Sequence, residues 1–194
     1  MGNPWHVTTE NSLPPLPVAL LLVDWQFAFT SVMPNGAAAV RRAILAARAA
    51  QLLGLPIAIT EHVPHKLGTT LPEIREAAPN APVFNKTAFS GVAADGLIEW
   101  LRERNVQHVL LTGLESPICI YQTAVQAMAE GFDVTLLADA VVERRAADRV
   151  HAFDTLCRAG AHILPVETVF YSLFSDSIHP QFREFTQLVK TFGD

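Results

Sequence analysis

Short runs of aliphatic and β-branched residues alternate with longer stretches in which apolar residues recur at helical spacing. The short runs predict six strands, at Val18–Asp24, Ile57–Glu61, Pro82–Asn85, His108–Thr112, Val134–Ala138 and Ala161–Leu164. The longer stretches predict helices at Ala37–Leu53, Ala94–Arg104, Ile118–Glu130 and Ala146–Arg158. Strands that alternate with crossover helices are typical of a parallel sheet covered on both faces. We therefore expect a three-layer α/β/α fold with a doubly wound, mainly parallel six-stranded sheet.

Three glycines mark the ends of predicted helices. Gly54, Gly131 and Gly160 each follow the last periodic residue of a helix and precede a new strand. Glycine in this place adopts the left-handed conformation that ends a helix without steric cost. By contrast, residues 1–17 hold four of the 13 prolines and little periodicity. We expect an extended N-terminal arm at 1–17 and a single domain at 18–194.

The composition favours a compact globular protein that acts on a small-molecule substrate. Of the 194 residues, 50% are hydrophobic and 17% are charged, which is unlike a disordered chain. The formal net charge is −5 and no basic run offsets it, so neither nucleic acid nor a membrane is expected as a partner. No apolar stretch approaches the roughly 20 residues needed to span a bilayer.

The two cysteines, Cys119 and Cys157, favour a reducing, cytoplasmic location. They form neither a disulfide framework nor a metal-binding motif. The first residues lack the charged start and apolar core of a signal peptide. Cys157 falls among apolar residues of the predicted helix Ala146–Arg158, where we expect a buried structural thiol.

Polar residues follow four of the predicted strands. Ligands of open parallel sheets bind outside the carboxyl ends of the strands, so these residues are candidates for a site. They are Asp24 after the first strand, Glu61 and His62 after the second, Asn85 and Lys86 after the third, and Glu115 through Cys119 after the fourth. An acid, a base and a thiol thus converge, although alone Asp24 could be a helix cap and Lys86 a solvated charge. Asp139 is expected to end the fifth strand and to cap the turn into Val141–Arg144.

Cys119 lies where an apolar strand turns into a helix. Ser116 is expected to be the N-cap and Pro117 the first helical residue. Cys119 would then sit in the first turn, where free backbone N–H groups and the helix dipole favour a thiolate or an oxyanion. The alternative is a buried cysteine that acts as a small hydrophobe.

Three ordered motifs resemble those of the isochorismatase-like cysteine hydrolase superfamily, which includes nicotinamidases and carbamoyl-amidases. They are Leu20–Phe29 for the acid, Lys86–Gly91 for the lysine and Thr112–Ala124 for the nucleophile. Two further stretches, Thr60–Thr70 and His179–Phe182, resemble the isochorismatase domain-containing branch. The resemblance covers nearly the whole chain and implies a Rossmann-like fold with hydrolase activity.

Carried over to this sequence, the resemblance implies a catalytic triad of Asp24, Lys86 and Cys119. Asp24 would accept the thiol proton, and Lys86 would balance the charge that a carboxylate places beside a thiolate. The backbone N–H groups of Glu115 and Cys119 would form the oxyanion hole. The resemblance also implies a cis peptide bond between Leu114 and Glu115.

Three functions are compatible with these residues. The first is hydrolysis of a C–N bond in a small amide, imide or carbamoyl compound through a Cys119 thioester. The second is hydrolysis of a vinyl ether, as in isochorismatases, which does not use the cysteine. The third is an idle oligomeric scaffold, although such a protein has no physical reason to place a buried charge pair beside a thiol.

Four residues near the triad are expected to bind substrate: Gln26, Phe29, His62 and Phe89. The two phenylalanines could equally belong to the core. Glu115 replaces the small residue common in nicotinamidases, and its side chain shapes the pocket floor or turns away into a salt bridge or a subunit contact.

No cofactor or metal is expected. Nicotinamidases carry an Asp-x-His pair with a further histidine, and the corresponding segment here reads Thr60-Glu61-His62-Val63-Pro64-His65. Glu61, His62 and His65 could in principle gather around an ion, but the pattern is broken. A homo-oligomer, dimer or tetramer, is expected from the apolar segment Val169–Phe174 and from Trp5, which could pack on a neighbouring subunit.

Overall fold

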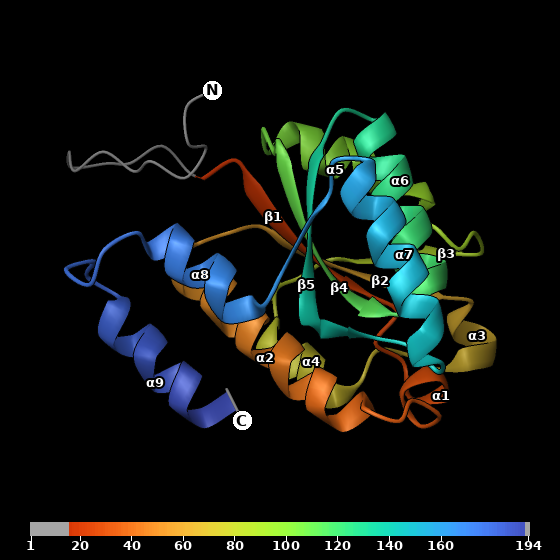
Figure 1. Ribbon diagram of the computed structural model, residues 1–194, viewed down its shortest axis with the longest axis horizontal. Coiled ribbons are helices and arrows are strands. Elements are labelled where there is room, and N and C mark those ends of the chain that lie inside the picture. The colour runs from red at the N-terminus through yellow and green to blue at the C-terminus, as the bar shows by residue number, and fades with distance from the viewer. Residues whose placement is uncertain (1–15, 193–194) are drawn as a thin grey trace.

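The computed structural model describes residues 16–192 and contains one six-stranded sheet with helices on both faces (Figure 1). The strand order is β3-β2-β1-β4-β5-β6, and every neighbouring pair is parallel. All six predicted strands are present. Their bounds are β1 (Val18–Val23), β2 (Ile57–His62), β3 (Val83–Lys86), β4 (His108–Leu114), β5 (Asp133–Val142) and β6 (His162–Leu164). The expected three-layer architecture is therefore confirmed, and most of the arm at 1–17 lies outside the described residues.

The four predicted helices are also present, with others that the hydrophobic pattern did not reveal. The α-helices are α1 (Phe27–Thr30), α2 (Gly36–Leu52), α3 (Pro64–Leu67), α4 (Pro72–Ala77), α5 (Leu97–Glu103), α6 (Tyr121–Ala129), α7 (Ala146–Arg158), α8 (Val166–Phe174) and α9 (Phe182–Phe192). Two short turns, η1 (Gly91–Ala93) and η2 (Ser116–Ile120), complete the chain. Gly54, Gly131 and Gly160 have positive φ, as expected of helix ends. No helix within residues 16–192 is long and apolar enough to cross a membrane.

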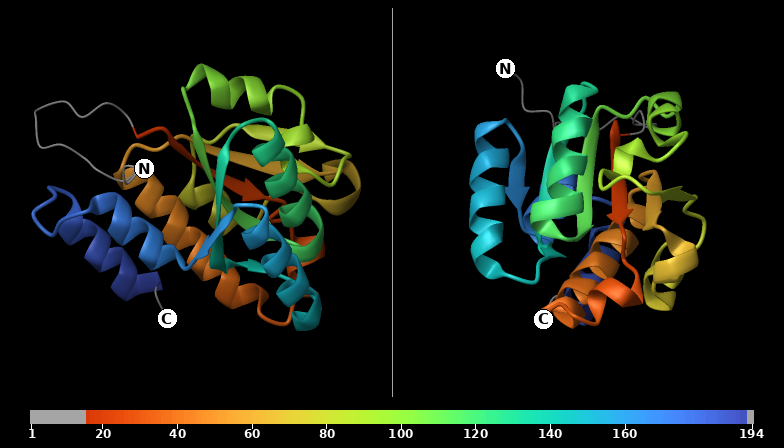
Figure 2. Two further views of the ribbon diagram at one scale, coloured as in Figure 1. Left: turned by 45° about the horizontal axis from the view of Figure 1, so that its top comes forward. Right: turned by 90° about the vertical axis from the view of Figure 1, so that its right-hand side faces the viewer.

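The central strand β1 is buried on both sides because its side chains alternate between two cores. Val18, Leu20 and Leu22 face the layer formed by α2, α4, α8 and α9. Ala19, Leu21 and Val23 face the opposite layer, formed by α5, α6 and α7. Figure 2 shows these two helical layers on either side of the sheet. A strand of this kind needs apolar residues at every position, which is why β1 reads as a continuous apolar run.

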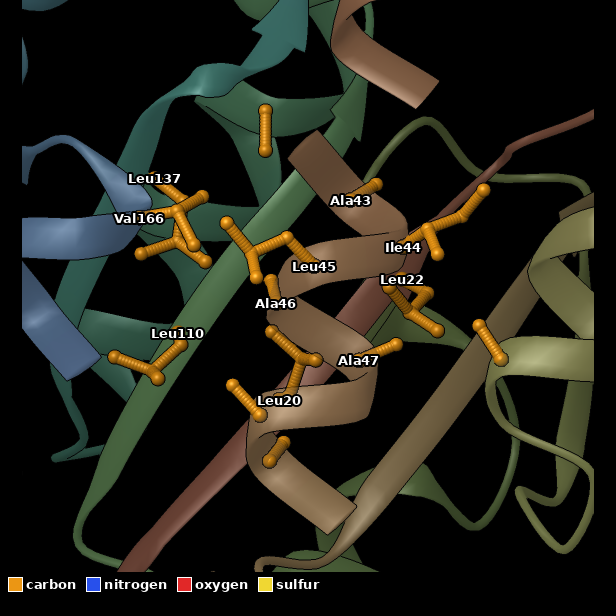
Figure 3. Packing of buried hydrophobic residues seen from close by; sticks show 14 of the residues in the cluster. Leu20, Leu22, Ala43, Ile44, Leu45, Ala46, Ala47, Leu110, Leu137 and Val166 are labelled. Carbon is orange, nitrogen blue, oxygen red and sulfur yellow. The ribbon is translucent and has the colours of Figure 1, made fainter. Parts of the chain in front are cut away.

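Alanines bring α2 close to the sheet. Ala43, Ala46 and Ala47 are fully buried, and in Figure 3 α2 lies over Leu20 and Leu22 of β1. Small side chains at a contact allow a helix backbone to approach its neighbour closely, and long aliphatic ones then fill the remaining space. This packed layer holds the carboxyl end of β1 in place.

The C-terminal helices cover the apolar segment that was expected to form a subunit contact. Phe170 and Phe174 of α8 are buried, and Phe174 stacks on Phe185 of α9 with 4.6 Å between ring centroids. The apolar side chains of Val169–Phe174 are therefore used mainly within the chain, and the segment gives no support for an oligomer. Trp5, the other basis for that expectation, lies outside the described residues.

Asp139 does not end β5, so this expectation was wrong. The strand continues to Val142, and the register between β4 and β5 shifts at an irregularity that contains Asp139. One carboxylate oxygen of Asp139 accepts a hydrogen bond from the backbone N–H of Val166 (2.8 Å), and the other pairs with Arg42 (2.6 Å). The residue therefore ties the start of α8 and helix α2 to the sheet.

The expectation of a buried Cys157 was also wrong. Leu156 and Ala152 are the buried residues of α7, whereas Cys157 is exposed. One residue further along a helix turns the side chain by about 100° around the axis. Cys157 thus leaves the apolar face that Leu156 occupies.

Candidate active site

The candidate site lies at the carboxyl ends of the central strands β1 and β4, between which the strand order of the sheet changes direction. From β1 the sheet extends through β2 and β3 on one side and through β4, β5 and β6 on the other. Such a switch point leaves a crevice between the connections that follow the two central strands. Asp24 directly follows β1, Lys86 ends β3, and Cys119 lies in the turn after β4. The topology therefore brings together the three residues expected to form the triad.

Gly113 allows the ends of β1 and β4 to approach each other closely. It pairs with Val23 and has a φ of 137°, which side chains rarely allow. A Cβ atom built on Gly113 would lie 2.0 Å from the carbonyl oxygen of Val23. Only glycine fits this contact. The contact lies one residue before Asp24 and two residues before Glu115.

Asp24 and Lys86 form a fully buried ion pair. Lys86 Nζ lies 2.5 Å from Asp24 Oδ2, and both side chains have an exposure of 0%. The Thr60 hydroxyl donates to Asp24 Oδ1 (2.8 Å). Lys86 Nζ also donates to the carbonyls of Ala88 (3.2 Å) and Phe89 (3.1 Å). Its three N–H groups therefore all have oxygen acceptors.

Asp24 itself is held in an uncommon backbone conformation, with a φ of 56°. Burial raises the pKa of the Asp24 carboxyl above its ordinary value, although the charge of Lys86 and hydrogen bonds from Lys86, Thr60 and Cys119 oppose this rise. A carboxylate in a dry site beside a thiol can act as a general base once a reaction demands the proton.

Cys119 is buried and its thiol is protonated in the resting site. Burial and the charge of Asp24 raise its pKa to about 12, against the opposing effect of Lys86, whose Nζ lies 3.9 Å from the sulfur. The start of a helix favours a thiolate, as the sequence analysis noted, but burial outweighs that effect here. The backbone N–H of Glu115 lowers the pKa of the thiol, but this effect is smaller than that of burial.

The turn that carries Cys119 differs from the expected helix start. Residues Ser116–Ile120 form a π-helical turn with Glu115 at its N-cap, and no side chain caps it. Ser116 is fully buried, and its hydroxyl donates to Glu143 (2.7 Å), which in turn pairs with Arg149. The expectation that Ser116 caps this helix was therefore wrong. The peptide bond between Leu114 and Glu115 is cis, as the resemblance implied.

A cavity of about 190 Å³ opens onto the Cys119 sulfur. Its walls are mostly apolar, and its lining residues are Phe29, His62, Leu67, Phe89, Leu114, Glu115, Ile118 and Cys119. The His62 ring stacks on Phe89 at a centroid distance of 5.7 Å and lies 6.3 Å from the ring of Phe29. Three of the four residues expected to bind substrate are thus placed around this cavity.

The fourth, Gln26, lies behind the cavity wall. Its side chain is fully buried, and its amide oxygen accepts the His62 N–H (2.7 Å). Its amide nitrogen donates to the carbonyls of His62 (3.1 Å) and Gly68 (2.5 Å). Gln26 therefore fixes the segment that carries His62 and Leu67 and does not line the cavity itself.

Leu67 and Ile118 line the cavity although the sequence analysis did not select them. Leu67 ends the short helix α3, and Ile118 immediately precedes the thiol. The only sequence signal for either residue was its position inside a quoted motif, because an aliphatic side chain carries no chemical mark of a binding site.

Thr123 is a further residue that the sequence analysis missed. Its hydroxyl accepts a hydrogen bond from the backbone N–H of Gly91 (2.6 Å) and donates to the carbonyl of Cys119 (2.6 Å). It therefore joins the loop after Lys86 to the turn that carries the thiol. A threonine at such a helical position is too common to be singled out from sequence.

Glu61, His62 and His65 do not converge. Glu61 turns toward Thr70 and accepts its backbone N–H (2.7 Å) and hydroxyl (2.8 Å). His62 lines the cavity, whereas His65 lines a separate groove with Asn85 and Asp95. Within residues 16–192, no three His, Cys, Asp or Glu side chains are grouped closely enough to hold a metal ion.

The side chain of Glu115 forms a salt bridge, one of the arrangements that the sequence left open. Both carboxylate oxygens accept from Arg144 Nε at 3.0 Å. Glu115 also lines the cavity. It is thus the one acidic residue of the cavity wall in the part of the chain that the structure describes.

Comparison with known proteins identifies relatives that match most of the sequence of this chain. Residues 18–168 match the family model described as the isochorismatase domain. Isochorismatase domain-containing protein 2 of Bos taurus is 37% identical over 144 residues, 74% of this chain and 69% of the relative. Isochorismatase domain-containing protein 1 of Danio rerio is 31% identical over 184 residues, 95% of this chain and 65% of the relative. The chain spans half to two thirds of the length of the domain-containing 1 proteins that it matches.

Two solved structures illustrate the structural likeness. The MAR1 ribonuclease of Caenorhabditis elegans is 33% identical, with a TM-score of 0.86 and 91% of each chain covered. The YcaC gene product of Escherichia coli, described as an octameric hydrolase of unknown specificity, is 21% identical, with a TM-score of 0.77 and 91% of this chain and 93% of that chain covered. The second likeness concerns the fold alone.

Proposed function

This chain belongs to the isochorismatase family, and on that premise we propose that it is a cysteine-dependent hydrolase of small amides, imides or carbamoyl compounds. One observation carries the proposal: Lys86 Nζ lies 2.5 Å from Asp24 Oδ2 and 3.9 Å from the Cys119 sulfur, and Cys119 and Glu115 line the same cavity. A base, a nucleophile and an oxyanion donor thus surround one position that a carbonyl group can occupy.

The first half of the proposed reaction forms a thioester. Asp24 takes the proton of the Cys119 thiol while the sulfur attacks the carbonyl carbon. A C–S bond forms, and the electron pair of the carbonyl π bond moves onto oxygen. The backbone N–H groups of Glu115 and Cys119 receive this oxyanion, and the loss of one such donor typically costs roughly 3–4 kcal/mol of transition-state stabilisation.

The second half releases the products. The oxyanion collapses, the C–N bond breaks, and Asp24 returns the proton to the leaving nitrogen. Asp24 then removes a proton from a water molecule that attacks the thioester, and the acid leaves as the thiol is protonated again. Lys86 stays paired with Asp24, and its charge opposes the burial that raises the pKa of the Asp24 carboxyl.

The raised pKa of Cys119 is compatible with this route. A neutral thiol beside a carboxylate needs no permanent charge separation, because the proton moves only when the attack begins. The buried pair beside it supports this role over that of a scaffold, since burying two charges costs free energy that a scaffold has no reason to spend.

We also propose a homo-oligomer, following the octamer described for the E. coli neighbour. Two free cysteines, one of them exposed, support a reducing compartment such as the cytoplasm. Light scattering that detects monomers alone would contradict the oligomer.

The test of the hydrolase uses p-nitrophenyl acetate, a neutral acyl donor, because no natural substrate needs to be known. We expect a burst of nitrophenolate and one acetyl group on Cys119, located by peptide mass spectrometry. Cys119→Ala should abolish both, and Asp24→Asn should slow acetylation by about a hundredfold or more. Both variants are made in a Cys157→Ser background, because exposed Cys157 also reacts with the ester. The burst and the acetyl group on Cys119 should remain in the Cys157→Ser protein itself.

The other two functions give different outcomes. Turnover that survives Cys119→Ala would favour a reaction that does not use the cysteine, such as vinyl-ether hydrolysis. The absence of acetylation in wild-type protein would favour the idle scaffold.

A further inference from the structure

Within residues 16–192, the side chains that line the cavity above Cys119 include one acid and no lysine or arginine. Five of its eight lining residues are apolar, and His62 and Cys119 add polar atoms. Glu115 is the one acid among the described residues that line it. A ligand that carries a carboxylate would lose its hydration here and find no lysine or arginine in the described wall to replace it.

The nearest ammonium group is already engaged. Lys86 Nζ lies close to the sulfur, but its N–H groups are directed to Asp24, Ala88 and Phe89. Its charge is matched by Asp24 at 2.5 Å. Because every donor has an acceptor, Lys86 cannot bind an anionic substrate without giving up a buried hydrogen bond.

The two side chains of the salt bridge between Arg144 and Glu115 differ in their exposure to solvent. The Arg144 side chain is 57% exposed, whereas that of Glu115 is 13% exposed. Water and salt screen the outer charge more strongly than the inner one. Glu115, which also lines the cavity, therefore carries the less screened charge of the pair.

We infer that the site admits uncharged amide substrates and excludes anions, with the Glu115 carboxylate as the residue that enforces the selection. The inference rests on the proposed function of Cys119 and specifies its substrate class. It excludes dicarboxylates such as isochorismate, and it also excludes RNA, whose phosphates are anionic. The acid product of amide hydrolysis would be repelled by the same carboxylate, which favours its release.

Iodoacetamide and iodoacetate provide a matched pair of probes, because they alkylate thiols in the same way and differ in one charge. Exposed Cys157 serves as the reference in the same molecule. Both reagents are applied to folded protein at one pH, and labelling of each cysteine is followed by mass spectrometry. The preference for iodoacetamide over iodoacetate should be about tenfold or more larger at Cys119 than at Cys157.

Glu115→Gln tests the residue itself. It removes the charge and retains the backbone N–H, so the preference of Cys119 for iodoacetamide should fall several-fold toward that of Cys157. Glu130→Gln is the matched control, because Glu130 also pairs with an arginine, Arg102 at 2.7 Å, but lies beyond the far end of α6. It should leave the preference unchanged.

The outcomes separate this inference from the proposed function. If Cys119 reacts with both reagents and prefers iodoacetate, or shows the same preference as Cys157, the selection against anions is overturned and the nucleophile stands. An unchanged preference in Glu115→Gln would overturn the role of that carboxylate. If neither reagent labels Cys119 while Cys157 is fully labelled and p-nitrophenyl acetate gives no acetyl group, the proposed function fails and this inference fails with it.

Discussion

The two cysteines of this chain both lie in helical segments, but Cys119 is buried and Cys157 is exposed. Each is on a helical segment that packs on the same face of the sheet, and each lies beside an ion pair. Cys119 is buried next to Lys86 and Asp24, whose side chains have an exposure of 0%. Cys157 is exposed next to Arg158 and Asp154, whose side chains are 79% and 57% exposed.

The difference shows what makes a thiol a candidate nucleophile. Residue type and neighbouring charge are shared by both cysteines, so neither is sufficient. Cys119 also lies beside the buried Asp24 carboxylate, whose charge raises the pKa of the thiol, and it lines a cavity. These features come from the ends of separate strands, and α7 alone cannot provide them for Cys157.

The largest expected effect is the loss of folding stability when the Lys86–Asp24 pair is broken, compared with the Arg158–Asp154 pair. Lys86→Met leaves Asp24 buried without its partner and should lower the free energy of unfolding by about 3–5 kcal/mol. Arg158→Met removes an exposed pair and should change it by less than about 1 kcal/mol. Urea unfolding at pH 7 measures both, and equal losses would show that the Lys86–Asp24 pair has no special energetic role.

The second effect is the rate of alkylation by iodoacetamide in the absence of substrate. A pKa of about 12 makes the thiolate fraction of Cys119 about a thousandfold smaller than an ordinary value near 9 would. Cys157 should therefore be labelled about a hundredfold or more faster at pH 8. The difference should vanish in urea, and faster labelling of Cys119 in folded protein would contradict the resting state described above.

The third effect is a decrease in the free energy of unfolding at alkaline pH. Below pH 9 the Cys119 thiol is protonated in both the folded and the unfolded protein. Its pKa is near 9 when unfolded and about 12 when folded, so above pH 9 the folded state binds more protons and stability falls as the pH rises. By pH 10 the wild-type protein should lose about 1.4 kcal/mol more than Cys119→Ser does.

Urea unfolding between pH 7 and pH 10.5 measures this slope. Cys157→Ser keeps the buried thiol and is expected to retain the wild-type slope. A wild-type protein and a Cys119→Ser variant that lose stability in parallel would contradict the raised pKa.

The smallest effect concerns two threonines that make the same local hydrogen bond, each to the carbonyl four residues earlier. Thr123 is buried and also accepts the N–H of Gly91, whereas Thr155 on α7 is exposed. Thr123→Val leaves Gly91 without an acceptor and should cost about 1–2 kcal/mol of stability, with slower acetylation of Cys119. Thr155→Val should cost less than about 0.5 kcal/mol, and equal effects on both measurements would remove the proposed link between the lysine loop and the thiol.

Much of the fold followed from the hydrophobic pattern because the central strands are buried on both faces. Such strands must be apolar throughout, and their ends must meet at one edge, which was enough to bring Asp24, Lys86 and Cys119 together. The helices α8 and α9 were not predicted, although the apolar residues of α9 recur at helical spacing and pack on α8 and α2.

The details of the site depend on the directions in which its side chains point, and the order of hydrophobic and polar residues does not specify these directions. Ser116 turns to Glu143 and Gln26 to the backbone of His62 because the turns around them point these side chains inward. Cys157 was misjudged because one residue along a helix separates a buried face from an exposed one. The pKa of Cys119 depends on burial by residues from several strands and loops, which only the assembled fold provides.

The close contact between Gly113 and Val23 has a consequence for engineering. The separation of Asp24 and Cys119 depends on a contact between two main chains, whereas the side chains of Phe29, Leu67, Phe89 and Ile118 line the cavity. Substitutions at these four positions can therefore alter which acyl compounds fit while the spacing of Asp24 and Cys119 stays constant. If the proposed hydrolase is correct, its substrate range can be redesigned separately from its chemistry.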